Sequence, residues 1–279
     1  INTNLQQFAS FGIKKTGTAA NSNALEWLKT KYQSFGYTAS QIVEDPFTFG
    51  NTSSKNLVVT KTGTVYPNTY VIICGHFDTI NGPGTNDNGS GVSVILEVAR
   101  ILQSVPTEYS IKFINFSGEE QGLYGSQHYV DSVVNPTNMD IKLVFNLDQV
   151  GGFGQENNTI VCERDQSAPT SNNAASVQMT NQLATCVDLY SDLQTVLGPA
   201  YSSDYIPFEE NGEIITGFYE NNGDNNPHPH TSTDTYANMN PSYVFQVAKA
   251  ATGAVQHFAV AQNILAATGE CTPEIAVQN

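Results

Sequence analysis

The strongest constraint on this chain is an alternation of short apolar runs with longer stretches of helical periodicity. Six runs are rich in β-branched and aromatic residues, and they span 57–60, 70–74, 111–116, 143–147, 159–162 and 214–218. Helical stretches lie at 21–35, 91–104, 122–133, 174–190 and 241–267. Strands that are apolar on both faces and alternate with helices are typical of a mostly parallel sheet. The sequence therefore predicts an α/β protein, a three-layer sandwich with helices on both faces of a central sheet.

Polar side chains follow three of these runs at the point where each predicted strand ends. The second run is followed by His76 and Asp78, the third by Glu119 and Glu120, and the fourth by Asp148. In an open α/β sheet, ligands collect beyond the carboxyl ends of the strands. We therefore expect these side chains to meet on one rim of the sheet.

Two further segments are expected at the same rim. The loop 84–91, rich in Gly and Asn, carries Asp87 and opens a predicted helix. The segment 227–235 carries His230, with His228 as a further candidate. Clustering several carboxylates without a cation is costly, because like charges repel and each group loses its hydration. Their joint position at strand ends therefore indicates a metal site.

The types of side chain indicate zinc, with manganese or cobalt as alternatives. Imidazoles and carboxylates without a thiolate form a borderline-hard ligand set that suits zinc. One catalytic zinc needs about three protein ligands, whereas five candidates are present, namely His76, Asp87, Glu120, Asp148 and His230. A carboxylate shared by two ions would divide five ligands into two sets of three. The sequence therefore predicts two metal ions, with Glu119 outside both ligand sets.

Composition excludes some classes of partner. The chain has 279 residues with 11 basic and 26 acidic side chains, and its formal charge of −15 argues against nucleic-acid binding. No apolar run approaches the ~18 residues that cross a bilayer, so we expect no membrane partner. The length and the 39% of hydrophobic residues predict one domain over residues 1–279, and we expect a monomer. The chain begins at Ile1 without a leader, so we expect a mature exported protein, extracellular or periplasmic.

Five motifs follow one another along the chain, and they are Gly75-His-Phe-Asp-Thr79, Asp87-Asn-Gly-Ser-Gly91, Gly118-Glu-Glu-Gln-Gly122, Asn146-Leu-Asp148 and His230-Thr-Ser-Thr-Asp-Thr235. In this order and spacing the sequence resembles the co-catalytic di-zinc exopeptidases, the family that includes the secreted bacterial leucine aminopeptidases. The similarity covers residues 20–267. It implies a secreted aminopeptidase with two Zn2+ ions that acts on peptide substrates with a free N-terminus.

The resemblance also implies which residues hold the metals. Asp87 would bridge the two zinc ions. One ion would be completed by Glu120 and His230, and the other by His76 and Asp148. The same five residues are the candidates that the strand ends and loops supply.

The resemblance implies roles for residues around the ligands as well. Glu119 would act as the general base, and Asp78 would fix the tautomer and orientation of the His76 imidazole. Asp234 is a weaker candidate for a supporting role near His230. The peptide bond after Asp87 resembles one that is cis in the family.

Substrate-binding residues match the family less closely. A tyrosine hydroxyl stabilises the developing negative charge in the family, and Tyr201 or Tyr205 would supply it here after a one-residue gap. Counting back from His230 without gaps places Phe218, Thr216 and Asn222 at positions that line the substrate pocket in the family. Gln149, which follows the fourth predicted strand, would join them. This wall mixes one aromatic ring with polar groups, so we expect a broader or shifted preference than that of leucine-type enzymes.

Other functions remain open on the same ligands. A related carboxypeptidase or dipeptidase would need a cationic clamp for the substrate carboxylate, and the two arginines, Arg100 and Arg164, lie outside the metal-site segments. A glutaminyl cyclase of the same fold would use one zinc and leave His76 and Asp87 without a role. A non-catalytic binding module typically lacks a ligand or the base, whereas all six are present here.

The cysteines are placed by chain direction. Helices that follow parallel strands end at the edge of the sheet opposite the ligand rim. That rule puts Cys186 and Cys271 together at the far edge, and it puts Cys74 and Cys162, which end strands, at the rim. If a disulfide forms, we expect Cys186–Cys271; four free thiols are the alternative.

Overall fold

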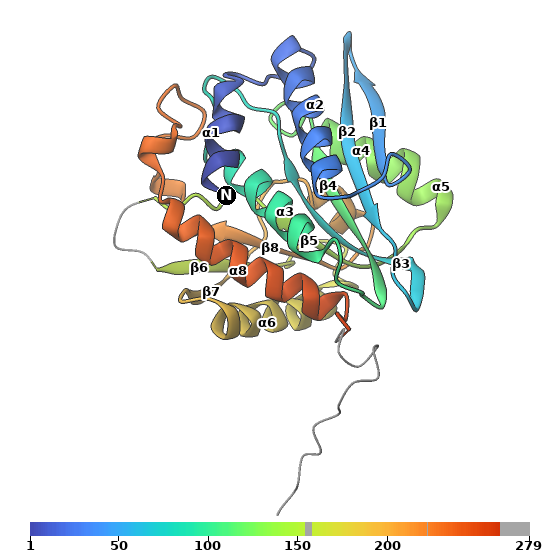
Figure 1. Ribbon diagram of the computed structural model, residues 1–279. Helices are drawn as coiled ribbons and strands as arrows, with labels where there is room; N and C mark the ends of the chain where they lie inside the picture. The colour runs from blue at the N-terminus through green and yellow to red at the C-terminus, as the bar shows by residue number, and fades with distance from the viewer. Residues whose placement is uncertain (154–157, 222, 263–279) are drawn as a thin grey trace, which may run out of the picture.

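The computed structural model describes residues 1–153, 158–221 and 223–262. Its centre is an eight-stranded sheet with the order β1-β2-β4-β3-β5-β8-β6-β7 (Figure 1). The strands are β1 (Ile42–Phe49), β2 (Thr52–Lys61), β3 (Tyr66–His76), β4 (Tyr109–Phe116), β5 (Asp140–Leu147), β6 (Thr159–Arg164), β7 (Gln194–Pro199) and β8 (Ile215–Glu220). The four central strands β4, β3, β5 and β8 are parallel, and three pairs toward the two ends of the order are antiparallel. The predicted α/β fold with a mostly parallel sheet is confirmed.

Helices cover both faces of this sheet. They are α1 (Asn2–Ser10), α2 (Ala19–Ser34), α3 (Gly89–Leu102), α4 (Tyr124–Tyr129), the π-helix η1 (Val130–Val134), α5 (Asn135–Thr137), α6 (Asn173–Tyr190), α7 (Ile206–Glu210), the 3-10 turns η2 (Gly223–Asn225) and η3 (Tyr236–Asn238), and α8 (Pro241–Phe258). Figure 1 shows α3 and α8 on the near face, with α4 and α5 behind β1 and β2. No helix within the described ranges has the length and apolar character needed to cross a membrane.

Alternate residues of the central strands point into two separate cores. In β3, Val71 and Ile73 belong to the larger core, to which α1, α2, α3, α6 and α8 contribute. Ile72 and Cys74 belong to the smaller core on the other face, with residues of α4, η1 and α7. All four side chains are fully buried. Burial on both faces explains why the central strands read as continuous apolar runs.

Every predicted strand and helix has a counterpart in the structure. Among the described residues, the elements that were not predicted are α1, β1, β7 and α7, together with the three-residue turns α5, η2 and η3. Both missed strands lie at edges of the sheet, where only Phe47 of β1 and no residue of β7 is buried, and β1 contains Pro46. Edge strands lack the two-sided burial on which the prediction relied. The predicted helix 241–267 ends at Phe258 instead, and residues 263–267 lie outside the described part of the chain.

The direction of β6 corrects the prediction for the cysteines. β6 pairs antiparallel with β8, so β6 and β7 run opposite to the central strands. Cys162 pairs with Phe218, which pairs with Leu147 at the carboxyl end of β5, so Cys162 lies near the rim as expected. In contrast, α6 carries Cys186 toward this rim and not toward the far edge that was predicted. The structure has Cys74, Cys162 and Cys186 as buried free thiols. Cys186 is therefore not in the expected disulfide, and Cys271, its expected partner, lies outside the described residues.

Two carboxyl groups are buried side by side where α7 meets the loop after β6. Glu209 and Asp165 are 2% and 1% exposed. Burial, together with the neighbouring Asp165, raises the pKa of Glu209 to about 7. Within the described residues, Oε1 of Glu209 and Oδ2 of Asp165 have no hydrogen-bond donor. An ionised Glu209 is therefore unfavourable in the folded state.

We expect Glu209→Gln to stabilise the fold at alkaline pH but not at acidic pH. The folded state keeps a proton on Glu209 that the unfolded chain loses near its ordinary value of 4.5, so the stabilisation from this proton is present below that pH and is lost as the pH rises through about 7. Chemical unfolding of variant and wild type at about pH 4, 6 and 8 should show a gap that grows to ~1–3 kcal/mol at the highest pH. A gap that does not change with pH would contradict this account.

Candidate metal centre

Three neighbouring parallel strands end side by side and place acidic and imidazole groups at one edge of the sheet. His76 is the last residue of β3, Glu119 and Glu120 follow β4, and Asp148 follows β5. Because β3 lies between β4 and β5, the His76 imidazole stands between the carboxylates of its two neighbours. The rim predicted from the strand ends is therefore present in the structure.

Asp87 reaches the same edge because the start of α3 packs tightly against the end of β5. The side chain of Asn88 caps α3 by accepting from the Gly91 amide at 3.0 Å, and it donates to the Leu147 carbonyl at 2.7 Å. Residue 91 has to be glycine, since an added Cβ would lie 2.3 Å from the Leu147 oxygen. The predicted cis peptide between Asp87 and Asn88 is confirmed.

The five candidate ligands form two groups that share Asp87. In one group, Nε2 of His76 lies 3.2 Å from Oδ1 of Asp87 and 3.4 Å from Oδ1 of Asp148. In the other, Nε2 of His230 lies 3.0 Å from Oδ2 of Asp87 and 3.0 Å from Oε2 of Glu120. The ligand atoms of each group lie within 4.8 Å of one another. The two oxygens of Asp87 face different groups, as a carboxylate that bridges two ions requires.

The charges of these groups favour a bound cation. Burial alone would raise the pKa of Asp87, but hydrogen bonds with His230 and His76 hold it well below its usual range. Asp87 and Glu120 raise the pKa of His230 to about 10. Burial opposes protonation of His76, yet the neighbouring carboxylates, Asp148 first, raise its pKa well above the ordinary value. Two bound divalent ions would supply this positive charge in place of the two ring protons.

The chemistry of the donor set fits two metal ions. Each group offers two carboxylates and one imidazole, a set that suits zinc and leaves coordination positions for water or substrate. A cavity of about 690 Å³ opens over both groups. The described part of the chain therefore provides ligands and space for a two-metal centre.

Asp78 supports the centre in a different way from the one that the resemblance implies. Its two carboxylate oxygens accept from the backbone amides of Glu119 and Glu120, each at 3.3 Å. The Nδ1 atom of His76 lies 3.0 Å from the backbone oxygen of Asp78 but 3.8 Å from its carboxylate. Asp78 therefore orients His76 through its main chain and uses its side chain to hold the turn that carries Glu119 and Glu120.

Asp234 lies beneath the bridging carboxylate. Its two oxygens accept from the backbone amides of Asn86 and Asp87, at 2.7 Å and 3.0 Å. Asp234 was expected to support His230, and its hydrogen bonds show that it holds the loop of Asp87 instead. It connects this loop to the segment that also carries His230.

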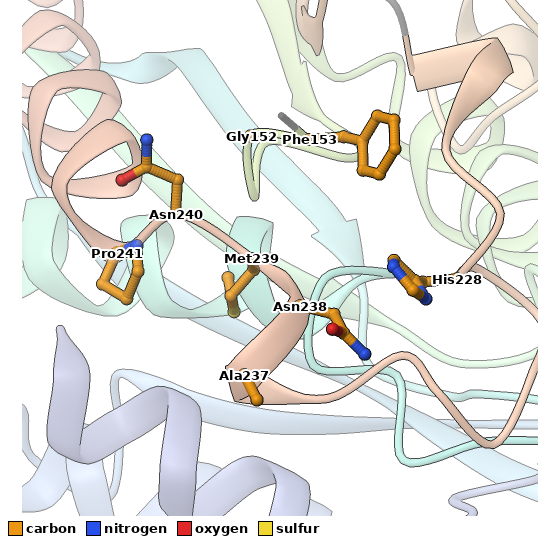
Figure 2. Close-up of a pocket in the computed structure, with 8 residues that line it drawn as sticks. All are labelled: Gly152, Phe153, His228, Ala237, Asn238, Met239, Asn240 and Pro241. Atoms are coloured by element: carbon orange, nitrogen blue, oxygen red, sulfur yellow. The ribbon is translucent and has the colours of Figure 1, made fainter. Parts of the chain in front are cut away.

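His228 lies outside both ligand groups. It lines a separate cavity of about 460 Å³, opposite Asn238 and beside Phe153 (Figure 2). Its Nδ1 atom lies 2.8 Å from the hydroxyl of Thr233, and its ring packs edge-on against Phe153 at 6.0 Å between centroids. The structure therefore separates His228 from His230, although the two are only two residues apart in sequence.

His230 adopts a backbone conformation that is uncommon for a residue with a side chain. Its φ angle is +57°, in the left-handed region that favours glycine. The imidazole is nevertheless directed at Asp87 and Glu120. This conformation is therefore consistent with a functional need for the side chain at this position.

Ser203 is a site residue that the sequence analysis did not identify. Its hydroxyl donates to Oδ2 of Asp148 at 2.5 Å and accepts from the side-chain amide of Asn146 at 2.9 Å. The carboxylate of Asp148 therefore has one oxygen near His76 and the other fixed by a serine from the loop after β7. Only the position of Ser203 next to Tyr201 and Tyr205, which were candidates, could have pointed to it.

The structure distinguishes the two candidate tyrosines. Tyr201 lines the cavity over the metal ligands and is 48% exposed. Tyr205 is 1% exposed, and its hydroxyl accepts from the backbone amide of Tyr201 at 2.6 Å. Tyr201 is therefore placed to meet a substrate, whereas Tyr205 anchors the loop on which Tyr201 lies.

Of the residues expected in the pocket wall, the structure places some in the cavity and others in the core. Gln149 lines the cavity, and a second cis peptide, which was not predicted, joins it to Asp148. Phe218 is fully buried and packs edge-on against Phe145 in the larger core, so its ring does not form part of this cavity. Thr216 is buried as well, and Asn222 lies outside the described residues.

Comparison with known proteins agrees with this geometry. The aminopeptidase YwaD of Bacillus subtilis is 32% identical over 217 residues, which are 74% of this chain and 45% of that protein. The structure of the LapA aminopeptidase of Legionella pneumophila superposes with a TM-score of 0.78 and 25% identity, over 92% of this chain and 70% of that one. The structure of BSAP, a zinc aminopeptidase from Bacillus subtilis, superposes with a TM-score of 0.65 and 29% identity, over 77% of this chain and 52% of that one.

Two carboxylate-imidazole groups at the edge of a mostly parallel sheet form a candidate two-metal site. Residues 56–255 match peptidase family M28, and the chain belongs to that family. The resemblance drawn from the sequence motifs is thereby confirmed. The chain spans less than half the length of the first curated relatives that it matches.

We expect Asp78→Asn to weaken metal binding although Asp78 is not a ligand. An amide nitrogen in place of one oxygen would face the backbone N–H of Glu119 or Glu120, which displaces the turn that carries both residues. Replacing a group that orients ligands typically lowers metal affinity by about 10–100-fold. A zinc competition titration with a chromogenic chelator measures this, with Asp131→Asn on the surface as the control. Unchanged zinc affinity in a folded Asp78→Asn variant would contradict the role.

Proposed function

We propose that this protein is a two-zinc aminopeptidase that releases N-terminal residues from peptides. The observation that carries the proposal is the pair of three-ligand groups joined by Asp87, with the carboxylate of Glu119 beside them, 3.9 Å from Nε2 of His76. Membership of the peptidase family and the names of the relatives support the reaction class.

The residues divide the work of peptide hydrolysis between them. Two zinc ions in these groups would supply Lewis-acid chemistry for an attacking water and the scissile carbonyl. Glu119 belongs to neither group, and its oxygens are free to accept a proton from that water and pass it to the leaving amine. Tyr201 lines the same cavity, and its hydroxyl is the group that we expect to donate to the carbonyl oxygen.

The cavity favours a free amine over a free carboxylate. It is lined by acidic groups, imidazoles and neutral polar residues, and no lysine or arginine lines it among the described residues. Arg100 pairs with Glu97 on the outside of α3, and Arg164 lies at the end of β6 that is remote from the rim. A carboxypeptidase would need such a cation, so this observation favours the aminopeptidase reading. Gln149, Tyr201, Ser202 and Asn226 give the wall a polar character, which supports a preference other than leucine.

We expect Glu119→Gln to bind two zinc ions and to lose almost all turnover. The change removes a proton acceptor but no metal ligand, so kcat should fall by about two or more orders of magnitude with little change in metal content. Elemental analysis and initial rates measure the two properties on the same preparation. Glu120→Gln is the matched comparison, because it removes a ligand of one group and should lower the metal content. Loss of zinc from Glu119→Gln would refute the assignment.

Blocking the substrate amine should abolish hydrolysis. Amino-acid anilides should be cleaved, and their N-acetylated counterparts should not, because the acetyl group removes the free amine that the acidic cavity binds. A chelator should inactivate the enzyme reversibly, and zinc or cobalt should restore it. One zinc per chain would favour a glutaminyl cyclase, and cleavage of acetylated substrates would favour a different peptidase class. Hydrolysis that continues in chelator would refute the metal mechanism.

A further inference from the structure

A second buried carboxylate lies beneath the metal centre and belongs to neither ligand group. Glu220 is the last residue of β8 and is fully buried. Among the described residues, no lysine, arginine or histidine forms an ion pair with it. Its position at the carboxyl end of a central strand is the position from which the metal ligands themselves come.

Four hydrogen-bond donors surround this carboxylate. Oε1 of Glu220 accepts from the side-chain amides of Asn86 at 2.9 Å, Gln149 at 3.2 Å and Asn226 at 3.1 Å. Oε2 accepts from the backbone amide of Gly152 at 2.5 Å. All four donors are uncharged, so hydrogen bonds alone compensate for the buried oxygens.

The donors come from the loops that carry metal ligands. Asn86 immediately precedes Asp87, and Gln149 immediately follows Asp148. The backbone amide of Glu220 also donates to the carbonyl of Gln149 at 2.8 Å. Through these contacts one side chain holds both the bridging ligand and a ligand of the first group.

The third loop contains Asn226 and leads to His230, a ligand of the second group. Asn226 donates to Glu220 and accepts from the backbone amide of His228 at 3.1 Å. Two residues further on, His230 faces Asp87 and Glu120. The chain from Asn226 to His230 is therefore held at both ends.

An apolar residue could fill this buried position at lower cost if its only task were packing, since burying a carboxylate without a cation is unfavourable. Asp234, another buried acid next to the centre, accepts only from the loop of Asn86 and Asp87 among the hydrogen bonds described. Glu220 differs because it joins three loops that are far apart in sequence. Its presence at this position is therefore best explained by the geometry that it imposes on those loops.

We propose that Glu220 is a positioning residue that fixes the loops of Asp87, Asp148 and His230 relative to one another, and thereby sets the geometry of both metal sites. Through Gln149 and Asn226 it also orients two residues of the cavity wall. The proposal concerns the metal centre of the proposed function, but metal binding tests it without any substrate.

Glu220→Gln tests the proposal with almost no change in volume. The amide can keep one oxygen, but its NH₂ group then faces either the three side-chain donors or the backbone N–H of Gly152. At least one loop must shift. We expect metal affinity to fall by about 10–100-fold, and the visible absorption spectrum of the cobalt-loaded protein to change because it reports ligand geometry. We expect kcat to fall with a smaller change in KM.

Glu209→Gln is the matched control, because it makes the same change at another buried carboxyl group outside the ligand loops. It should keep the wild-type cobalt spectrum, metal affinity and kcat. A folded Glu220→Gln protein with the wild-type spectrum and metal affinity would overturn the proposal. A spectral change of equal size in Glu209→Gln would also overturn it, because the effect would then be a general one.

Asn226→Ala gives a second test that holds if Glu220→Gln does not fold. It removes one donor and leaves three, so the protein should fold, and the loop of His230 alone should loosen. In a metal titration, we expect the affinity of the binding step assigned to the His230 group to fall and the affinity of the step assigned to the His76 group to stay the same. If neither affinity changes, the connection between Glu220 and the His230 loop is refuted. If the wild type binds two metals but cleaves no anilide, the proposed function fails while this metal-binding test still stands.

Discussion

The centre depends on one carboxylate whose two oxygens serve different partners. Asp87 places one oxygen toward His76 and the other toward His230, and no single ligand group is complete without it. Such a shared group tolerates little movement, because a shift that improves one site worsens the other. The surrounding contacts restrict such movement. Asp234 holds the backbone of Asp87, and the side chain of Asn88, the next residue, bonds to the start of α3 and to the end of β5.

Three hydrogen-bonded carboxylates next to the ligands show how an acid can be buried there without a cation of its own. Asp78, Asp234 and Glu220 accept from backbone or side-chain amides rather than from cations. Each acid thereby holds a loop by two or more contacts of fixed direction. Charge neutralisation is left to the inner groups, where metal ions are expected, and hydrogen bonding stabilises the outer ones.

The sequence was sufficient for the fold class and for the five candidate ligands because both follow from local rules, whereas the division of the ligands into two groups came from the family resemblance of the motifs. Two-sided burial makes central strands apolar, and ligands gather where such strands end, so His76 and Asp148 could be placed in advance. The supporting residues could not. Ser203 and Glu220 act through contacts between segments that are distant in sequence, and their roles depend on side-chain direction. The antiparallel β6 was missed for the same reason, since an apolar run does not reveal its direction.

The strand β8 explains why core packing and site geometry are inseparable here. Phe218 packs into the larger core, while its carbonyl accepts from the amide of Asp148 at 3.2 Å, and two residues later Glu220 bonds to Gln149 through its backbone and its side chain. The pairing of β5 with β8 therefore continues past the last residue of β5 into the ligand segment. A slip of β8 by one residue would turn Phe218 out of the core and Glu220 away from its donors. The register that buries the aromatic ring is thus the same register that positions Asp148, which is why a residue expected to contact substrate proves to act through the core.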